Sequence, residues 1–189
     1  MTEEKRPRLK IRLRPKIATK HVPQRVRKTI LSVEVPAFPI THQSERRLAR
    51  VLSVQALYAH ACQRELSLTE LFRFEWEKSR SKSSRQFAAE LVRGTLEHLE
   101  QIDDLIKPRL VNWDFDRISP VNKAILRLSI YCLLFRKDVP AKVTINEGVD
   151  LTKLFSDTDD YKFVNALLDR IRREVPEASS ELPPPPTQT

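Results

Sequence analysis

The sequence predicts an all-α protein, a single compact bundle of six or seven helices with a disordered basic arm before it and a proline-rich tail after it. Only 2 of the 189 residues are glycine, whereas a β protein of this size usually needs more glycine for its turns. Between residues 44 and 175, apolar residues recur three or four positions apart, which is typical of amphipathic helices. Apart from the charged arm, no stretch alternates apolar and polar residues long enough to favour a strand.

The first helix is expected from about Ser44 to Cys62, with an acidic residue in its first turn. At 100° per residue, its apolar side chains fall on one broad arc, formed by Leu48, Val51, Leu52, Ala56, Ala59 and Cys62. Ser67 and Glu70 have the spacing of a capping box, in which each residue satisfies a backbone N–H near the other. They predict a short second helix.

A long third helix is expected over residues 83–108, because it opens on a second box of this kind and ends near a proline. Gly94, in its middle, predicts close contact with another helix. Ser119 followed by Pro120 is the pattern of an N-cap with proline at the first helical position. The helix that follows, through Phe135, is apolar nearly all round and should be central.

Two further helices complete the bundle. One is expected over residues 138–154 and the other after the polar cluster at 156–159. The last helix turns inward Phe163, Val164, Leu167, Leu168 and Ile171. Arg127 lies within the apolar fourth helix, and a buried arginine needs a partner. Glu147 or Asp150 on the next helix could supply it.

The positive charge is concentrated at one end of the chain. Residues 1–43 hold 11 Lys or Arg against 3 Asp or Glu, a net charge of +8, whereas residues 44–189 hold 23 against 22, a net charge of +1. Five prolines and like-charge repulsion predict a disordered arm that binds nucleic acid nonspecifically or only aids solubility. The tail, residues 176–189, carries four consecutive prolines and should not pack.

Composition also excludes several function classes. Two glycines cannot build the phosphate-binding loops of the common nucleotide folds. His60 and Cys62 point in different directions from one helix, so they make a poor metal pair. We therefore expect no enzyme, cofactor or metal. The longest apolar run, residues 124–135, is too short for a membrane span. Since no apolar segment follows the basic N-terminus as in a signal peptide, a cytoplasmic protein with reduced cysteines is expected.

The first helix carries the best candidate site. Arg46, Arg47 and Arg50 occupy one sector of about 100°, and Tyr58 lies two turns further along. Arginines that meet phosphates beside a ring that stacks on bases suit single-stranded RNA. A solvated helix face explains the same pattern. For Lys162 and Phe163 on the last helix, the alternative to base stacking is an ordinary core position for the phenylalanine.

Three long segments resemble the bacterial transcription antitermination factor NusB family in the family's order and spacing. The resemblance covers roughly residues 45–175. It rests above all on AILRL, on DVPAKVTINEGVDLTK and on KFVNALLD.

The resemblance implies a helical RNA-binding protein that works with a partner, the ribosomal protein NusE. Together they would hold the single-stranded boxA element of nascent ribosomal RNA and help RNA polymerase to resist termination. By the same resemblance, RNA would meet Arg46, Arg47, Arg50, Tyr58, Lys162 and Phe163, and NusE would meet Glu147, Asp150 and Asp159. The chain departs from the family at Leu48, often a basic position, and at Asn122, often an acidic one, and both departures bear on the strength of base recognition.

Two alternatives remain open at the level of the sequence. The same helical domain forms the N-terminal part of an rRNA cytosine methyltransferase, so the chain could be an RNA-targeting module. It could also be a protein-interaction scaffold without RNA binding, against which the three arginines argue. Whether the free protein forms a homodimer is also open.

Overall fold

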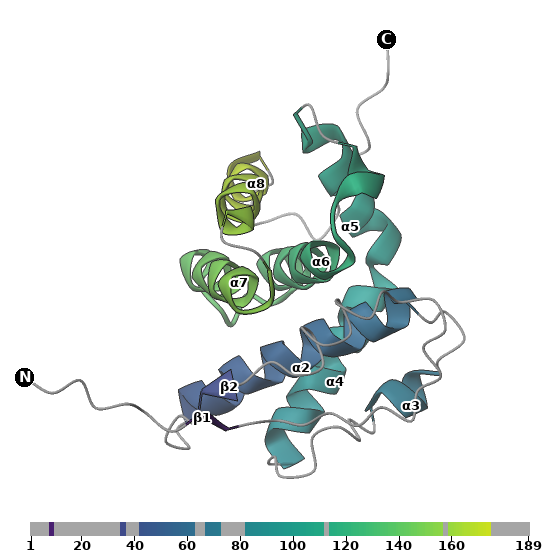
Figure 1. Ribbon diagram of the computed structural model, residues 1–189, viewed down its shortest axis with the longest axis vertical. Coiled ribbons are helices and arrows are strands. Elements are labelled where there is room, and N and C mark those ends of the chain that lie inside the picture. Colours follow the sequence, from purple (N-terminus) through teal and green to yellow (C-terminus); the bar gives the residue numbers. More distant parts are fainter. Residues whose placement is uncertain are drawn as a thin grey trace, which may run out of the picture. The chain divides into compact units, whose positions relative to one another are not determined.

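The computed structural model describes residues 8–9, 35–36, 42–62, 67–72, 82–111, 114–156 and 159–174. In these segments the chain forms seven α-helices, α2 to α8 (Figure 1), which confirms the all-α prediction. The strands among the described residues are two short ones, β1 (Arg8–Leu9) and β2 (Val35–Pro36), which pair antiparallel. The rest of the predicted arm and the whole proline-rich tail lie outside the described residues.

The helices are divided between two compact units, Met1–Ala89 and Glu90–Thr189, a division that the sequence did not predict. The first unit contains α2 (His42–Cys62), α3 (Leu68–Phe72) and the first half of α4 (Lys82–Glu97). The capping box before α3 is confirmed, since the backbone N–H of Ser67 donates to Glu70 Oε2 at 3.0 Å and the backbone N–H of Glu70 donates to Ser67 Oγ at 3.3 Å.

Helix α2 is buried over most of its length. Every residue from Leu48 to Tyr58 is at most 8% exposed. Ser53 donates to the Ala49 carbonyl at 2.8 Å and lies 3.4 Å from the Ala88 carbonyl of α4, so it satisfies its hydroxyl inside the packed region. A side chain this small lets two helix backbones approach each other closely.

The long third helix of the prediction is in fact two helices. Helix α4 ends at Glu97 and α5 (Leu99–Ile106) begins after His98, whose φ of −109° and ψ of 18° leave the helical conformation. The ring Nδ1 of His98 lies 2.9 Å from the Gly94 carbonyl, and the ring centroid lies 4.0 Å from that of Phe135. The break therefore places the imidazole between the end of its own helix and an aromatic ring of another, a tertiary contact that helical periodicity cannot reveal.

The second unit is built around α6 (Pro120–Phe135), α7 (Ala141–Phe155) and α8 (Asp160–Glu174), which pack together (Figure 1). The predicted N-cap is confirmed, because Ser119 Oγ accepts from the Asn122 backbone N–H at 3.3 Å. A Cβ at Gly148 would lie 2.8 Å from Ser129 Oγ and 3.0 Å from Leu168 Cδ1. Glycine on α7 thus allows α6 and α8 to approach it.

Gly94 has the close contact that its position in the sequence predicts. A Cβ at this residue would overlap the ring of Tyr131 on α6. Burial raises the pKa of the Tyr131 hydroxyl, an effect that the charge of Arg136 partly offsets. No helix of the described segments is both long and apolar enough to cross a bilayer.

The prediction that Arg127 pairs with an acidic residue of α7 is wrong. Its Nε and Nη2 donate to the two carboxylate oxygens of Asp103 at 2.8 and 2.6 Å, and both side chains are about 15% exposed. Arg127 therefore faces α5, so it does not pair with Glu147 or Asp150 of α7. Beside this pair is the ring of Phe115, in the short 3-10 helix η2 (Phe115–Arg117), 5.8 Å from the guanidinium carbon.

Candidate nucleic-acid interface

The arginines at the start of α2 differ in their surroundings. Arg46 and Arg47 are half-buried, and the guanidinium carbon of Arg46 lies 3.9 Å from the ring centroid of Phe87 on α4. A cation held against an aromatic face in this way is attracted to the ring's quadrupole. The edge of the guanidinium, which carries its N–H groups, is thereby held in a defined orientation. Beside it, Ser83 donates to Glu45 Oε2 at 3.0 Å, which also links α4 to α2.

Arg50 does not share the exposure expected of the basic start of this helix. Only 7% of it is accessible, because it already belongs to the buried stretch that begins at Leu48. Leu48, itself 8% exposed, is a core residue. Leucine, in place of the basic residue that is common at this position in the family, therefore adds to the hydrophobic core.

Tyr58 is buried as well, with 5% of its surface accessible. Its side chain hydrogen bonds with that of Cys62, one turn further on. Burial raises the pKa of the Cys62 thiol, and this hydrogen bond partly offsets the increase. The sequence placed Tyr58 at the edge of the apolar arc, but packing has taken its ring out of solvent. Its local role in the structure is to pack the end of α2.

The first turn of α8 carries two of the predicted RNA contacts. Lys162 is 67% exposed, and its Nζ lies 2.8 Å from Oδ1 of Asp159, which is 80% exposed. The two residues were predicted to face RNA and NusE respectively, and here they pair with each other. Phe163 is half-buried. Its exposure lies between that of a core residue and that of a ring available for base stacking, the two roles that the sequence allowed.

Asn122 has a role that the sequence did not reveal. It is 4% exposed, and its Nδ2 donates to Asp160 Oδ2 at 2.7 Å. The hydroxyl of Ser156 donates to the same carboxylate oxygen. Asn122 thus joins the first turn of α6 to the first residue of α8, two residues before Lys162. The one available signal for Asp160 was its place at the start of a helix, where acids are common.

The acidic residues of α7 that were predicted to meet a partner are both half-buried. Among the described residues, the Oε2 atom of Glu147 is buried with no hydrogen-bond partner. Asp150 lies one turn further along the same helix, so the two carboxylates share a face. An unsatisfied buried carboxylate oxygen is costly.

No group of three or more His, Cys, Asp or Glu side chains that could hold a metal ion occurs among the residues that the structure describes. The arrangement offers cations, carboxylates and half-buried aromatic rings, which are the groups of a binding surface. The basic start of α2 belongs to the first unit, and α7 and the start of α8 belong to the second.

Comparison with known proteins identifies one family. Residues 47–173 match the model of the NusB family. The transcription antitermination protein NusB of Treponema pallidum is 44% identical over 133 residues, which cover 69% of this chain and 94% of that protein. The solved structure of Thermotoga maritima NusB ("T. maritima NusB") has a TM-score of 0.63 at 37% identity and covers 68% of this chain and 91% of that one. A chain of the crystal structure of the antitermination factors NusB and NusE in complex with dsRNA has a TM-score of 0.63 at 30% identity, and the match covers 69% of this chain and 98% of that one.

Proposed function

Since the chain belongs to the NusB family, we propose that it is a transcription antitermination factor that binds boxA-type single-stranded RNA of nascent ribosomal transcripts together with NusE. In this role it joins the complex that keeps RNA polymerase from terminating, and it has no catalytic function. The observation that carries the proposal is the similarity to a chain of the crystal structure of NusB and NusE in complex with dsRNA, of which 98% is covered.

The start of α2 has the chemistry that this function requires. Guanidinium groups form charge-assisted hydrogen bonds with phosphate oxygens, often in pairs. Arg46 and Arg47 are accessible enough to make them, and the stacking of Arg46 on Phe87 reduces the side-chain entropy lost on binding. Arg50, at 7% exposure, contributes mainly through its charge or after a local rearrangement.

The start of α8 supplies a second contact. RNA phosphates compete with Asp159 for Lys162, and a base can lie against the exposed part of Phe163. Stacking on aromatic rings is worth about 1–3 kcal/mol per base. NusE binds the acidic face of α7, which carries the half-buried side chains of Glu147 and Asp150.

A titration tests the proposal directly. The full chain is titrated into three labelled RNAs, a boxA-like single strand, a scrambled single strand and a duplex, each with and without purified NusE. We expect the boxA-like strand to bind most tightly, and NusE to raise that affinity by roughly 5- to 150-fold, the usual range for coupled sites.

Three results would count against the proposal. Equal affinity for the boxA-like and scrambled strands would exclude sequence recognition. Equal affinity with and without NusE would exclude the cooperative complex. A preference for the duplex would replace the single strand as the ligand.

A further inference from the structure

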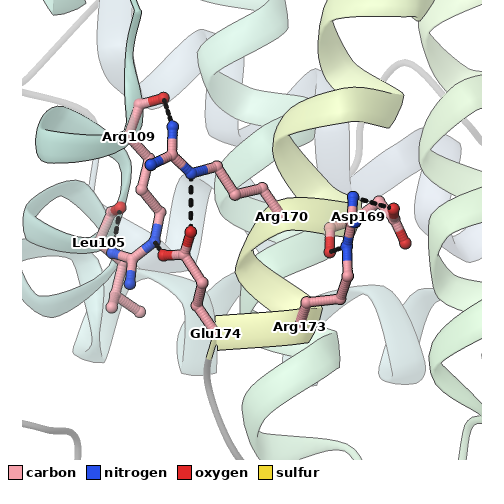
Figure 2. Close-up of polar contacts among 6 residues, drawn as sticks. All are labelled: Leu105, Arg109, Asp169, Arg170, Arg173 and Glu174. Atoms are coloured by element: carbon pink, nitrogen blue, oxygen red, sulfur yellow. Dashed lines mark hydrogen bonds and ion pairs between the residues drawn. The ribbon is translucent and has the colours of Figure 1, made fainter.

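A second group of arginines lies at the C-terminal end of α8 (Figure 2). We call it the α8 arginine surface. It consists of Arg170, Arg172 and Arg173 of α8 and Arg109 of the short 3-10 helix η1 (Lys107–Arg109). All four belong to the second compact unit. None of them belongs to the candidate interface described above.

Glu174 holds two of these arginines in place. Arg109 Nε donates to its Oε2 and Arg170 Nε to its Oε1, both at 2.8 Å (Figure 2). Arg109 Nη1 also donates to the Leu105 carbonyl at 2.9 Å. The hydrogen bond from Arg170 lowers the pKa of Glu174, burial opposes this effect and the charge of Arg109 adds to it. One ionised carboxylate thus orients two guanidinium groups that are 61 residues apart in the sequence.

Asp169 holds the other two. Arg173 Nη2 lies 2.7 Å and Arg172 Nη2 3.4 Å from its carboxylate oxygens. These arginine side chains are 67% and 44% exposed. The contacts with Asp169 use two N–H groups of Arg173 and one of Arg172, whereas a guanidinium carries five. Donors therefore remain on the solvent side of both.

The charges of this surface do not cancel. Four guanidinium groups share two carboxylates, Asp169 and Glu174, so the end of α8 carries an excess of positive charge. The half-exposed ion pairs themselves add little stability. Their effect is to hold the arginine forks in fixed orientations, and such forks match the geometry of phosphate oxygens.

We propose that the α8 arginine surface binds the phosphodiester backbone of RNA as an additional contact, independent of sequence. This inference rests on the proposed RNA-binding function. It extends that function to a surface that would contact RNA without recognising the boxA sequence. The four residues include no aromatic ring on which a base could stack, and phosphate contacts position a nucleic acid without reading its sequence. The surface therefore adds affinity for any RNA strand.

Arg172→Gln/Arg173→Gln is the test variant, because glutamine keeps helix propensity and removes two charges. Lys137→Gln/Lys142→Gln is the matched control, which removes two charges from exposed side chains outside this surface in the same unit. Binding of boxA-like and scrambled single strands is measured between 50 and 200 mM salt for the full chain and both variants.

The test variant should lose about fivefold in affinity at 50 mM salt, as for two exposed ion pairs. Its salt slope should fall by about 1.4, since each phosphate contact on a single strand contributes about 0.7. Over a fourfold change in salt this slope difference amounts to about sevenfold, so the variant and the unchanged chain should bind about equally at 200 mM. Both RNAs should show the same losses, and the lysine control should show neither.

Asp169→Asn gives an independent check in the opposite direction. It removes one negative charge beside Arg172 and Arg173, and the stronger attraction for phosphate should outweigh the loss of their fixed orientation, so RNA affinity should rise by about twofold to fivefold. The variant also shows whether the protein still folds when this end of α8 is altered, because a gain in binding requires an intact surface.

Several outcomes would overturn the inference. If the unchanged chain binds RNA and the arginine variant matches the lysine control in affinity and slope, the surface makes no RNA contact. If RNA affinity is unchanged and a parallel titration with labelled NusE shows weaker binding by the variant, the surface serves a protein partner. A loss confined to the boxA-like strand would mean sequence recognition. A chain that binds no RNA at all would contradict the proposed function as well, which separates the two failures.

Discussion

Asn122 and Asp160 join two helices through one hydrogen bond, from the Asn122 amide in the first turn of α6 to the carboxylate at the first position of α8, at 2.7 Å. Because the donor is an amide, only one of the two residues is charged. The asparagine of this pair is buried, with 4% of its surface exposed. The substitution that the family resemblance suggests, an acid at position 122, would place two carboxylates in contact.

Asn122→Asp should therefore destabilise the protein by about 1–3 kcal/mol at pH 7, the usual cost of a buried polar group without its partner. Repulsion between the two carboxylates raises the pKa of one of them in the folded state. When the pKa of an acid is higher in the folded than in the unfolded protein, the group stabilises the fold at pH values below its unfolded pKa, near 4. That stability is lost as the pH rises through the pKa of the folded protein. Urea unfolding at pH 4 and pH 7 measures the difference.

The double variant Asn122→Asp/Asp160→Asn is the control. It exchanges the amide and the carboxylate between the two positions and should recover most of the stability at pH 7. A single variant as stable as the unchanged chain at both pH values would mean that the hydrogen bond does not hold the start of α8.

Asp103→Ala should cost about 1.5–3 kcal/mol in the free energy of unfolding, the usual contribution of hydrogen bonds to a charged group. The reason is that the variant leaves the guanidinium of Arg127, 16% exposed, without its bidentate partner. Asp104→Ala, one residue along, is the matched control, because its pair with Lys107 is about half-exposed on both sides. Chemical unfolding should separate the two; equal midpoints would show that burial of the first pair has no energetic effect.

Arg46→Ala/Arg47→Ala should reduce the salt slope of RNA binding by about 1.4, one phosphate contact each. It should have little effect on unfolding, since both side chains are half-exposed. Arg50→Ala is expected to behave differently, with a change in unfolding as well, because this side chain is 7% exposed. Unchanged affinity and slope in the Arg46/Arg47 variant would place the RNA surface elsewhere.

Tyr58→Ala should destabilise the domain by about 3 kcal/mol or more, as for other large aromatic residues removed from a core. Its effect on RNA binding can therefore be assigned only after a melting curve. Tyr58→Phe keeps the ring and removes the hydroxyl that hydrogen bonds with Cys62. If Tyr58 supports a base, the phenylalanine variant should bind RNA nearly as well as the unchanged chain. An alanine variant that melts normally would contradict the buried position.

The sequence was sufficient for two of the helix starts, which depend on residues three or four positions apart, but not for the third helix, because α4 begins at Lys82, before the second predicted box. Ser67 with Glu70, and Ser119 with Pro120, mark where α3 and α6 begin, because a cap uses only neighbours in the chain. The apolar periodicity predicts the helical class for the same reason, and Gly94 indicates a close contact without naming Tyr131. The charges at the start of α2 are equally visible in the sequence.

Only the tertiary structure decided which residues meet across the fold. Arg127 takes Asp103 as its partner and not an acid of α7, His98 ends α4 against Phe135, and Asn122 finds Asp160 38 positions away. Arg50 and Tyr58 look accessible on a helical wheel but are buried by packing. A helical pattern gives the direction of a side chain about its own axis, whereas burial and pairing depend on what other helices place in that direction, and that information is spread over the whole chain.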